Sequence, residues 1–238
     1  MSASHFDEIA AVYDESLPPH VVEHYLRKRT AFVAALCPAR AAVLDVGCGT
    51  GALAGRLASA GYEVTGVDPS EGMLDVMRKR SPEARAVLAS GTDIPFEDGA
   101  FDLVLSVATF HHIAEAGAVQ QTLAEMTRVA RPGGHVLVWD HNPANPYWSN
   151  LMARVPQDTG EERLIPAAEL LDGLRAAGAE VVSVQQLGFV PDFTPRRAIR
   201  GAAALERLGE RTPLARRLAA HNVVVARKAA NDVPSVKP

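Results

Sequence analysis

Hydrophobic and polar positions follow two periods along the first part of the chain. Residues 5–15 and 19–36 have apolar positions at helical spacing, and Pro19 suits the first turn of the second helix. Short apolar runs bounded by turn-forming residues predict buried strands at 42–46, 63–68, 84–89, 101–107 and 135–140. The segments between these runs have a helical period, at 52–60, 70–80 and 115–130. This order predicts an α/β fold, in which a mostly parallel sheet has helices on both faces.

The order changes beyond the fifth predicted strand. One more helix and two more strands are predicted, at 166–177, 179–186 and 220–227. Residues 141–165 and 188–219 interrupt this series, and we expect them to be insertions after the fifth and sixth strands, over the ligand side of the sheet. We therefore expect one domain over residues 1–230, with 42–140 as its ligand-binding core and 231–238 as a frayed tail.

Composition and charge exclude some classes of protein. The net charge of −4 gives no global indication of nucleic-acid binding, and no apolar run approaches the length of a membrane span. The N-terminus lacks the pattern of a secretory signal. Cys37 and Cys48 do not have the spacing of metal ligands, so we expect reduced thiols, a cytoplasmic location and no bound metal.

A glycine-rich loop follows the first predicted strand, in the segment VLDVGCGTG at residues 43–51. Gly47, Gly49 and Ala52 formally satisfy the dinucleotide pattern G-x-G-x-x-[G/A], in a strand-turn-helix context. Asp68 lies at a suitable distance along the chain for an acid that binds a ribose. An NAD(P)-dependent oxidoreductase is therefore one interpretation, although no recognisable set of hydride-transfer residues accompanies the loop.

Asp45 separates the two ligand classes, because it lies at the mouth of this loop. A carboxylate there repels a pyrophosphate, but it favours a ligand with an amino group and a positively charged sulfur. S-adenosylmethionine has both groups, a ribose for Asp68 and no phosphate. The backbone amides of residues 47–51 stay free for the carboxylate of this ligand. Charge therefore favours the methyl donor.

Four segments resemble the class I S-adenosylmethionine-dependent methyltransferases, in their small-molecule, type 11-like branch. They are VLDVGCGTG, VTGVDPSEGML, DIPFEDGAFDLVLSVATFHHI and VARPGGHVLV, in order between residues 43 and 140. The resemblance implies a Rossmann-like sheet of seven strands with the last strand antiparallel. It also implies in-line transfer of a methyl group to an oxygen, nitrogen or carbon atom of a small-molecule acceptor, leaving S-adenosylhomocysteine.

The resemblance also implies the ligand contacts. Residues around the methionine moiety would be Asp45, Gly47, Cys48, Gly49 and Gly51. Asp68 would bind the ribose hydroxyls, Pro69 and Met73 would border the adenine, and the backbone near Ser106 would accept from the donor's amino group. One position departs from the family, because Ser90 stands where many relatives have an aspartate that holds the adenine amine. Three nearby residues are the substitutes that we expect, namely Gly91, Thr92 and Asp93.

Candidates for the transfer chemistry are few, since a general base is needed only if the acceptor keeps its proton until attack. His111 and His112 follow the fourth predicted strand, and extended backbone would point only one of them into the cleft. His141 follows the fifth strand, and Tyr13 lies in a segment that resembles the N-terminal lid of the family, expected over residues 1–36. A structural role for each of these four side chains is the alternative.

Two further patterns receive a plain interpretation. His20, Glu23 and His24 match the inverted zinc-protease pattern H-x-x-E-H, but we expect an ordinary polar helix face there. Seven arginines and two glutamates between residues 196 and 217 give a local charge of +5. Without interleaved aromatic residues we expect a solvated helix face there and no nucleic-acid partner. The acceptor and the oligomeric state stay open, and a non-catalytic donor-binding module is the third alternative.

Overall fold

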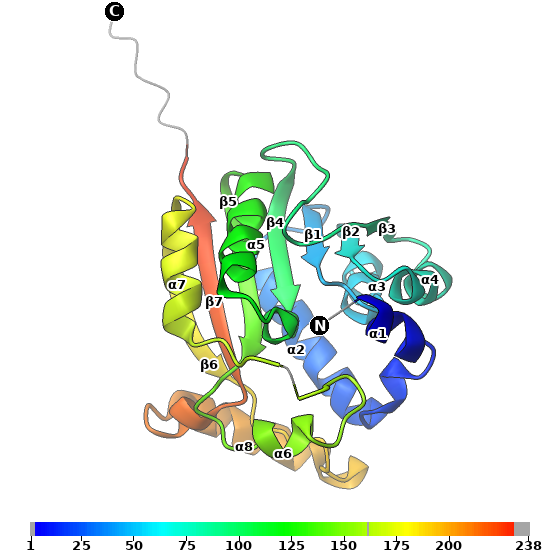
Figure 1. Ribbon diagram of the computed structural model, residues 1–238. Coiled ribbons are helices and arrows are strands. Elements are labelled where there is room, and N and C mark those ends of the chain that lie inside the picture. The colour runs from blue at the N-terminus through cyan, green and yellow to red at the C-terminus, as the bar shows by residue number, and fades with distance from the viewer. Residues whose placement is uncertain (1–2, 161, 231–238) are drawn as a thin grey trace, which may run out of the picture.

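A computed structural model describes residues 3–160 and 162–230 of the chain (Figure 1). The tail predicted for 231–238 lies outside the described residues. No helix among the described residues is long and apolar enough to cross a membrane.

One sheet of seven strands, in the order β3-β2-β1-β4-β5-β7-β6, runs through the molecule. The strands are β1 (Ala42–Val46), β2 (Glu63–Asp68), β3 (Arg85–Leu88), β4 (Phe101–Val107), β5 (Ala130–His141), β6 (Ala179–Leu187) and β7 (His221–Lys228). β7 is antiparallel to both of its neighbours, whereas the pairs formed by β1 to β5 are parallel. This topology confirms the predicted mostly parallel α/β sheet and its antiparallel last strand.

Helices cover both faces of the sheet, as predicted (Figure 1). On one face lie α5 (Ala116–Val129) and α7 (Ala167–Ala176), and on the other α2 (Pro19–Leu36), α3 (Ala52–Ser59) and α4 (Glu71–Arg80). Each face has its own hydrophobic core, one around Leu123 and Met126 of α5, the other around Leu57 of α3 and Met77 of α4. Each of these fully buried side chains stabilises the fold by about 1.5–3 kcal/mol.

The N-terminal segment differs from the single helix predicted over residues 5–15. It consists of α1 (Ala3–Ile9), a turn, and the short 3-10 helix η1 (Tyr13–Glu15). Asp7 accepts hydrogen bonds from Ser70 Oγ and Gly72 N of α4, at 2.6 and 2.8 Å, while Asp14 accepts one from Thr50 Oγ1 at 3.0 Å. Because these anchors lie on different elements, the chain turns between them. Tertiary contacts here override the helical period.

The fifth strand begins earlier than predicted. Ala130 pairs with Phe101 and His135 with Leu103, so residues 131–134, which lie between the predicted helix and the predicted strand, bulge out within β5. Gly133 supports this bulge with a left-handed φ of 75°. The other predicted strand and helix bounds agree with the structure to within about one residue, apart from the two insertions.

Both predicted insertions leave the sheet at one edge. β5 ends at His141 and β6 at Leu187, and both residues lie opposite His221. The first insertion contains α6 (Trp148–Met152), and the second contains α8 (Ile199–Arg211) between the short helices η3 (Arg196–Ala198) and η4 (Ala215–Leu218). Figure 1 shows α6 and α8 at the end of the molecule where β4 and β5 finish.

Candidate functional site

Two cavities lie at the carboxyl edge of the sheet, where α/β proteins bind ligands. The β2 cavity, of about 480 Å³, is lined by residues that follow β2, β3 and β4. The β5 cavity, of about 500 Å³, is lined by the ends of β1 and β5, by α2 and by both insertions. Five residues line both cavities, namely Tyr13, Gly47, Gly49, Ala108 and His112. The two cavities therefore meet beside the glycine loop.

The glycine loop has a backbone that other residues would strain. Gly47 and Gly51 have φ values of 74° and 75°, and a Cβ on them would lie 2.2 Å from Thr109 and 2.4 Å from Met77. Gly49 has a φ of 52°, but a Cβ there would meet no atom within 4 Å. Two of the predicted glycines are thus required by close packing, whereas the third leaves open space beside both cavities.

Asp45 lies under this loop with 3% of its surface exposed, and it lines the β5 cavity. Burial, together with the charge of Asp68, raises the pKa of Asp45 to about 7, although the guanidinium of Arg29 opposes this shift. Arg29 lines the same cavity, 5.8 Å from the ring centres of both Tyr25 and Trp139, and its buried Nε has no hydrogen-bond partner among the described residues. A carboxyl group and a guanidinium therefore line one cavity.

Sequence reasoning missed Arg29. The signal was present, because Arg29 lies four residues after Tyr25 and three after Leu26, on the same face of α2. A charged residue inside an apolar helical stripe marks a buried charge, and such charges need a partner or a ligand.

Asp68 ends β2 and lines the β2 cavity, as its predicted role requires. Its two carboxylate oxygens accept hydrogen bonds from Gly49 N and Ser70 N, both at 2.9 Å. Burial raises the pKa of Asp68, while these two hydrogen bonds oppose the shift. Each carboxylate oxygen can accept a second hydrogen bond, so Asp68 retains acceptors for a ligand. Pro69 and Met73 line the cavity beside it.

The other predicted contacts divide into two groups. Gly91 and Thr92 line the β2 cavity together with Ser90, and Cys48 lines the β5 cavity. Three predicted contacts line neither cavity in the described structure, namely Gly51, Asp93 and Ser106. The Ser106 hydroxyl instead donates to the carbonyl of Val46 at 2.8 Å. Ala108, two residues later, has a left-handed φ of 54° and borders both cavities.

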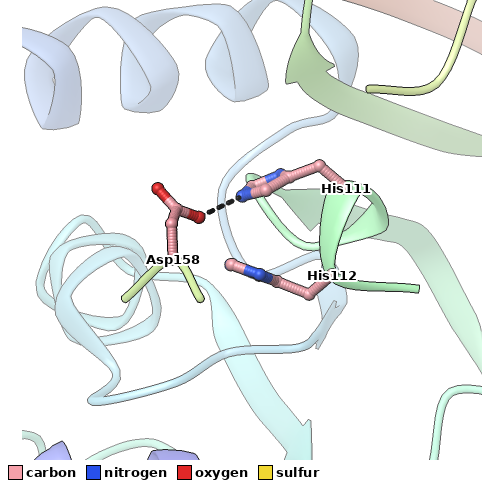
Figure 2. A group of neighbouring side chains, drawn as sticks. All are labelled: His111, His112 and Asp158. Atoms are coloured by element: carbon pink, nitrogen blue, oxygen red, sulfur yellow. Dashed lines mark ion pairs between the residues drawn. The ribbon is translucent and has the colours of Figure 1, made fainter. Parts of the chain in front are cut away.

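His111 and His112 correct an expectation, because both side chains line the β5 cavity. They lie in the 3-10 helix η2 (Phe110–His112), where successive side chains diverge less than in an extended strand. Their ring centres are 3.9 Å apart. Figure 2 shows the His111 ring facing the carboxylate of Asp158, with His112 beside it. The second histidine is therefore not turned away from the cavity, as extended backbone would require.

Asp140 holds His111 in one orientation. Its Oδ1 accepts from His111 Nδ1 at 2.8 Å, and its carboxylate also accepts from the backbone amides of Thr109, Phe110 and His141. Burial alone would raise the pKa of Asp140, but the charge and hydrogen bond of His111 together with these amides lower it. Burial likewise opposes protonation of His111, yet Asp140 raises the pKa of His111 above its usual value. With Nδ1 donating to Asp140, Nε2 faces the cavity.

Asp158 is the second functional candidate that the sequence did not indicate. Its Oδ1 lies 4.0 Å from His111 Nε2, and this buried oxygen has no hydrogen-bond partner among the described residues. Burial raises the pKa of Asp158 to about 6. Asp158 comes from the irregular insertion at 141–165, so only the folded chain brings it to the histidines (Figure 2).

The remaining candidates are uncharged in this site. Burial lowers the pKa of His112 to about 2 and that of His141 well below its usual value, and the charge of His111 adds to both shifts. The His141 ring stacks between His111 and Trp148, with ring centres 3.9 and 3.5 Å away. Burial and the charge of Asp14 raise the pKa of Tyr13 to about 12, so its phenol keeps its proton.

Two overlapping groups in this site have ligand atoms close enough for a metal ion. One consists of His111, His112 and Asp158, and the other of His111, Asp140 and His141, with ligand atoms within 4.8 Å of one another in each. The separate H-x-x-E-H pattern on α2 does not converge. Its first and last histidines contact Thr194 O and Glu206, while its glutamate pairs with Arg56.

Comparisons with known proteins agree with this geometry. Residues 44–138 match the methyltransferase domain family. An uncharacterized methyltransferase of Mycobacterium tuberculosis is 43% identical over 107 residues, which cover 44% of this chain and 42% of that protein. The demethylmenaquinone methyltransferase of Renibacterium salmoninarum is 30% identical over 187 residues, 71% of this chain and 77% of that protein. A solved structure from Thermotoga maritima, described as an S-adenosylmethionine-dependent methyltransferase and possible histamine N-methyltransferase, has a TM-score of 0.68 at 22% identity, covering 94% and 98% of the two chains.

These matches cover different shares of the chains and therefore support different conclusions. The mycobacterial relative is matched over less than half of its length, so that likeness concerns the core. The Thermotoga structure shows a common fold. The Renibacterium relative is matched over most of both chains, and the glycine loop of the core lies where the two cavities meet. The chain therefore belongs to the class I S-adenosylmethionine-dependent methyltransferases, in the branch of the type 11 methyltransferase domain.

Proposed function

We propose that this enzyme transfers a methyl group from S-adenosylmethionine to a small-molecule acceptor in the β5 cavity. The observation that carries the proposal is the pair Asp45 and Arg29, a buried carboxyl group and a guanidinium that line the same cavity beside the glycine loop. An amino-acid end group has one charge of each sign, so it can satisfy both residues. A pyrophosphate would satisfy Arg29 but would be repelled by Asp45.

The residues of the β2 cavity fit the nucleoside part of this ligand. Asp68 has free acceptor capacity for ribose hydroxyls, and Met73 and Pro69 offer apolar contact for a base. Gly91 and Thr92 line the same cavity, so their backbone groups are the candidates for holding the adenine in place of the family's aspartate. The bound donor supplies an electrophilic methyl group on a sulfonium, and the protein's contribution is to align it and exclude water.

We assign His111 as the group that accepts a proton from the acceptor, where the acceptor has one to lose. Asp140 fixes the ring so that Nε2 faces the cavity, and the ionised carboxylate stabilises the imidazolium that forms. His112 is the weaker candidate for a base, because its lowered pKa makes it a poor proton acceptor. Asp158, on the far side of Nε2, would stabilise the same imidazolium.

The β5 cavity also indicates the acceptor class. Aromatic side chains from both insertions line it, namely Tyr147, Trp148, Phe189 and Phe193. Leu26, Leu151 and Val155 add apolar surface. The Renibacterium relative is named for demethylmenaquinone, an apolar aromatic acceptor. We therefore propose an acceptor with a flat, largely apolar body and one nucleophilic oxygen, nitrogen or ring carbon.

A screen for homocysteine release tests this function. The protein is incubated with S-adenosylmethionine, a coupling hydrolase and a panel of phenols, hydroxyquinones and aromatic amines. We expect turnover of at least one flat apolar acceptor and its loss in Asp45→Asn. If the protein binds the donor but turns over no member of the panel, the non-catalytic binding module is favoured instead. Binding of NADH in place of the donor, followed by fluorescence, would favour the oxidoreductase.

A further inference from the structure

Helix α8 turns its two acidic residues toward the protein and exposes its basic ones. Glu206 is 2% exposed, and it accepts hydrogen bonds from His24 at 2.8 Å and from the backbone of Phe189 at 2.8 Å. Glu210 pairs with Lys28 of α2 and accepts from Gly188 N. Both negative charges of the segment are therefore neutralised on the inner side of the helix.

The outer side has only positive charge and apolar surface. Seven exposed arginines surround it, and none makes an ion pair with a described residue: Arg196, Arg197, Arg200, Arg207, Arg211, Arg216 and Arg217. The side chains of Leu205, Leu208 and Leu214 are 70%, 63% and 74% exposed, and Leu218 and Phe193 are exposed beside them. These arginines and five apolar residues form what we call the α8 face.

The spacing on α8 makes this face amphipathic. Residues 201, 204, 205 and 208 follow one another at helical spacing and form an exposed stripe of glycine, alanine and leucine. Arg200, Arg207 and Arg211 lie along one edge of the stripe. The sequence predicted a solvated helix face here. That prediction was incomplete, because leucines are exposed together with the arginines.

We propose that the α8 face docks the protein onto the surface of an anionic lipid bilayer. A helix of this kind lies in the plane of the interface, with its leucines among the acyl chains and its arginines at the headgroups. A second copy of the chain fits the face poorly, since a two-fold contact would place the arginines of one face against those of the other. A nucleic acid would satisfy the arginines but would leave the leucines exposed.

The α8 face adjoins the β5 cavity, which suggests what docking would do for the enzyme. This step rests on the proposed function. Phe193 belongs to the α8 face and also lines the β5 cavity, where it lies 5.9 Å from the ring of Tyr147. Docking through this face would therefore place the rim of the β5 cavity at the bilayer. The acceptor class that benefits is an apolar molecule dissolved in the membrane.

Vesicle co-sedimentation without donor or acceptor tests the docking by itself. Vesicles of phosphatidylcholine alone are compared with vesicles containing about one third phosphatidylglycerol. We expect the protein to bind the anionic vesicles and not the neutral ones. Arg207→Glu/Arg211→Glu should weaken binding at least about tenfold, because each basic residue near such a surface contributes about fivefold in affinity. Leu205→Ser/Leu208→Ser should weaken it as well.

Two control variants reverse one basic charge or replace one leucine at exposed positions outside the α8 face. Lys79→Glu on α4 and Leu88→Ser on β3 also change exposed side chains, and both should bind anionic vesicles as the parent does. The proposal is overturned if the parent does not bind anionic vesicles or if the α8 variants bind them unchanged. It is also overturned if the leucine variant only converts a dimer to a monomer in light scattering, or if the face retains duplex RNA but no vesicle.

Calorimetry with S-adenosylhomocysteine separates this proposal from the proposed function. The α8 variants should bind it with the affinity of the parent, because the substituted residues line neither the β2 cavity nor the β5 cavity. Vesicle binding without donor binding would refute the methyltransferase assignment alone, and the reverse result would refute the docking alone.

Discussion

Asp45 is held in an unfavourable state in the unliganded protein. Its pKa is raised to about 7 by burial and by the charge of Asp68, even though the guanidinium of Arg29 lies in the same cavity. When a carboxyl has a higher pKa in the folded than in the unfolded protein, the free energy of unfolding falls as the pH rises from the lower to the higher of these two pKa values. A positively charged ligand group would remove this penalty, so the proposed donor would stabilise the ionised acid where the fold does not.

Asp45 therefore predicts a pH dependence of donor affinity. Between pH 6 and pH 8 the carboxylate changes from mostly protonated to mostly ionised, so the affinity for S-adenosylhomocysteine should rise by roughly tenfold. Asp45→Asn should bind about tenfold or more weakly at pH 8 and lose this dependence. It should also melt roughly 5 °C or more higher than the unliganded parent at pH 8, since the raised pKa destabilises the ionised form. Calorimetry and thermal melts check this, with Asp172→Ala on α7 as the control.

Substitution of His111 separates a role as proton acceptor from a purely structural role. His111→Ala should lower kcat about 10²- to 10⁴-fold while donor affinity stays unchanged. The rate of the parent should rise with pH through the raised pKa of His111, and Asp140→Asn should move this limb to lower pH. His135→Ala, six residues before His141 on β5, serves as the control. A loss of activity with chelator that a divalent cation restores would show instead that His111 and Asp158 hold a metal.

At the scale of elements, local patterns were sufficient for the parallel core. The strands at 42–46, 63–68 and 101–107 have the predicted bounds, because each is a short apolar run that ends in turn-forming residues. The break between α1 and η1 was not predictable, since Asp7 and Asp14 find their partners only in the folded chain. Asp158 was missed for the same reason, because its insertion has no periodic pattern.

The N-terminal segment provides a prediction at this scale. Asp14 links it to Arg80 and Thr50, beside Tyr13 at the junction of the two cavities. Asp14→Ala should release this segment, so that S-adenosylhomocysteine dissociates about five- to tenfold faster and protease cleaves the segment more readily. Global stability should change by no more than about 1 kcal/mol, because the pair is partly exposed. Stopped-flow measurements check this. Equal rates for Asp14→Ala and for the neighbouring control Glu15→Ala would refute the lid.

At the scale of the molecule, the β2 cavity and the β5 cavity lie at one edge of the sheet. The adjacent strands β2, β1 and β4 position the glycine loop and most of the residues around the β2 cavity, where the sequence motifs lie. The β5 cavity is formed by α2 and the two insertions, whose sequences have no motif that names a ligand. The proposed donor therefore follows from local sequence motifs, whereas the proposed acceptor class depends on side chains brought together by the whole fold.

A direct comparison of the two ligand classes tests the central claim. Calorimetric titration of the protein with S-adenosylmethionine and, separately, with NADH compares a cationic thioether nucleoside with a pyrophosphate. We predict micromolar or tighter binding of S-adenosylmethionine, weakened in Asp45→Asn, and no measurable binding of NADH. Binding of NADH with no heat from S-adenosylmethionine would contradict the account, because the buried carboxylate would then not select the ligand.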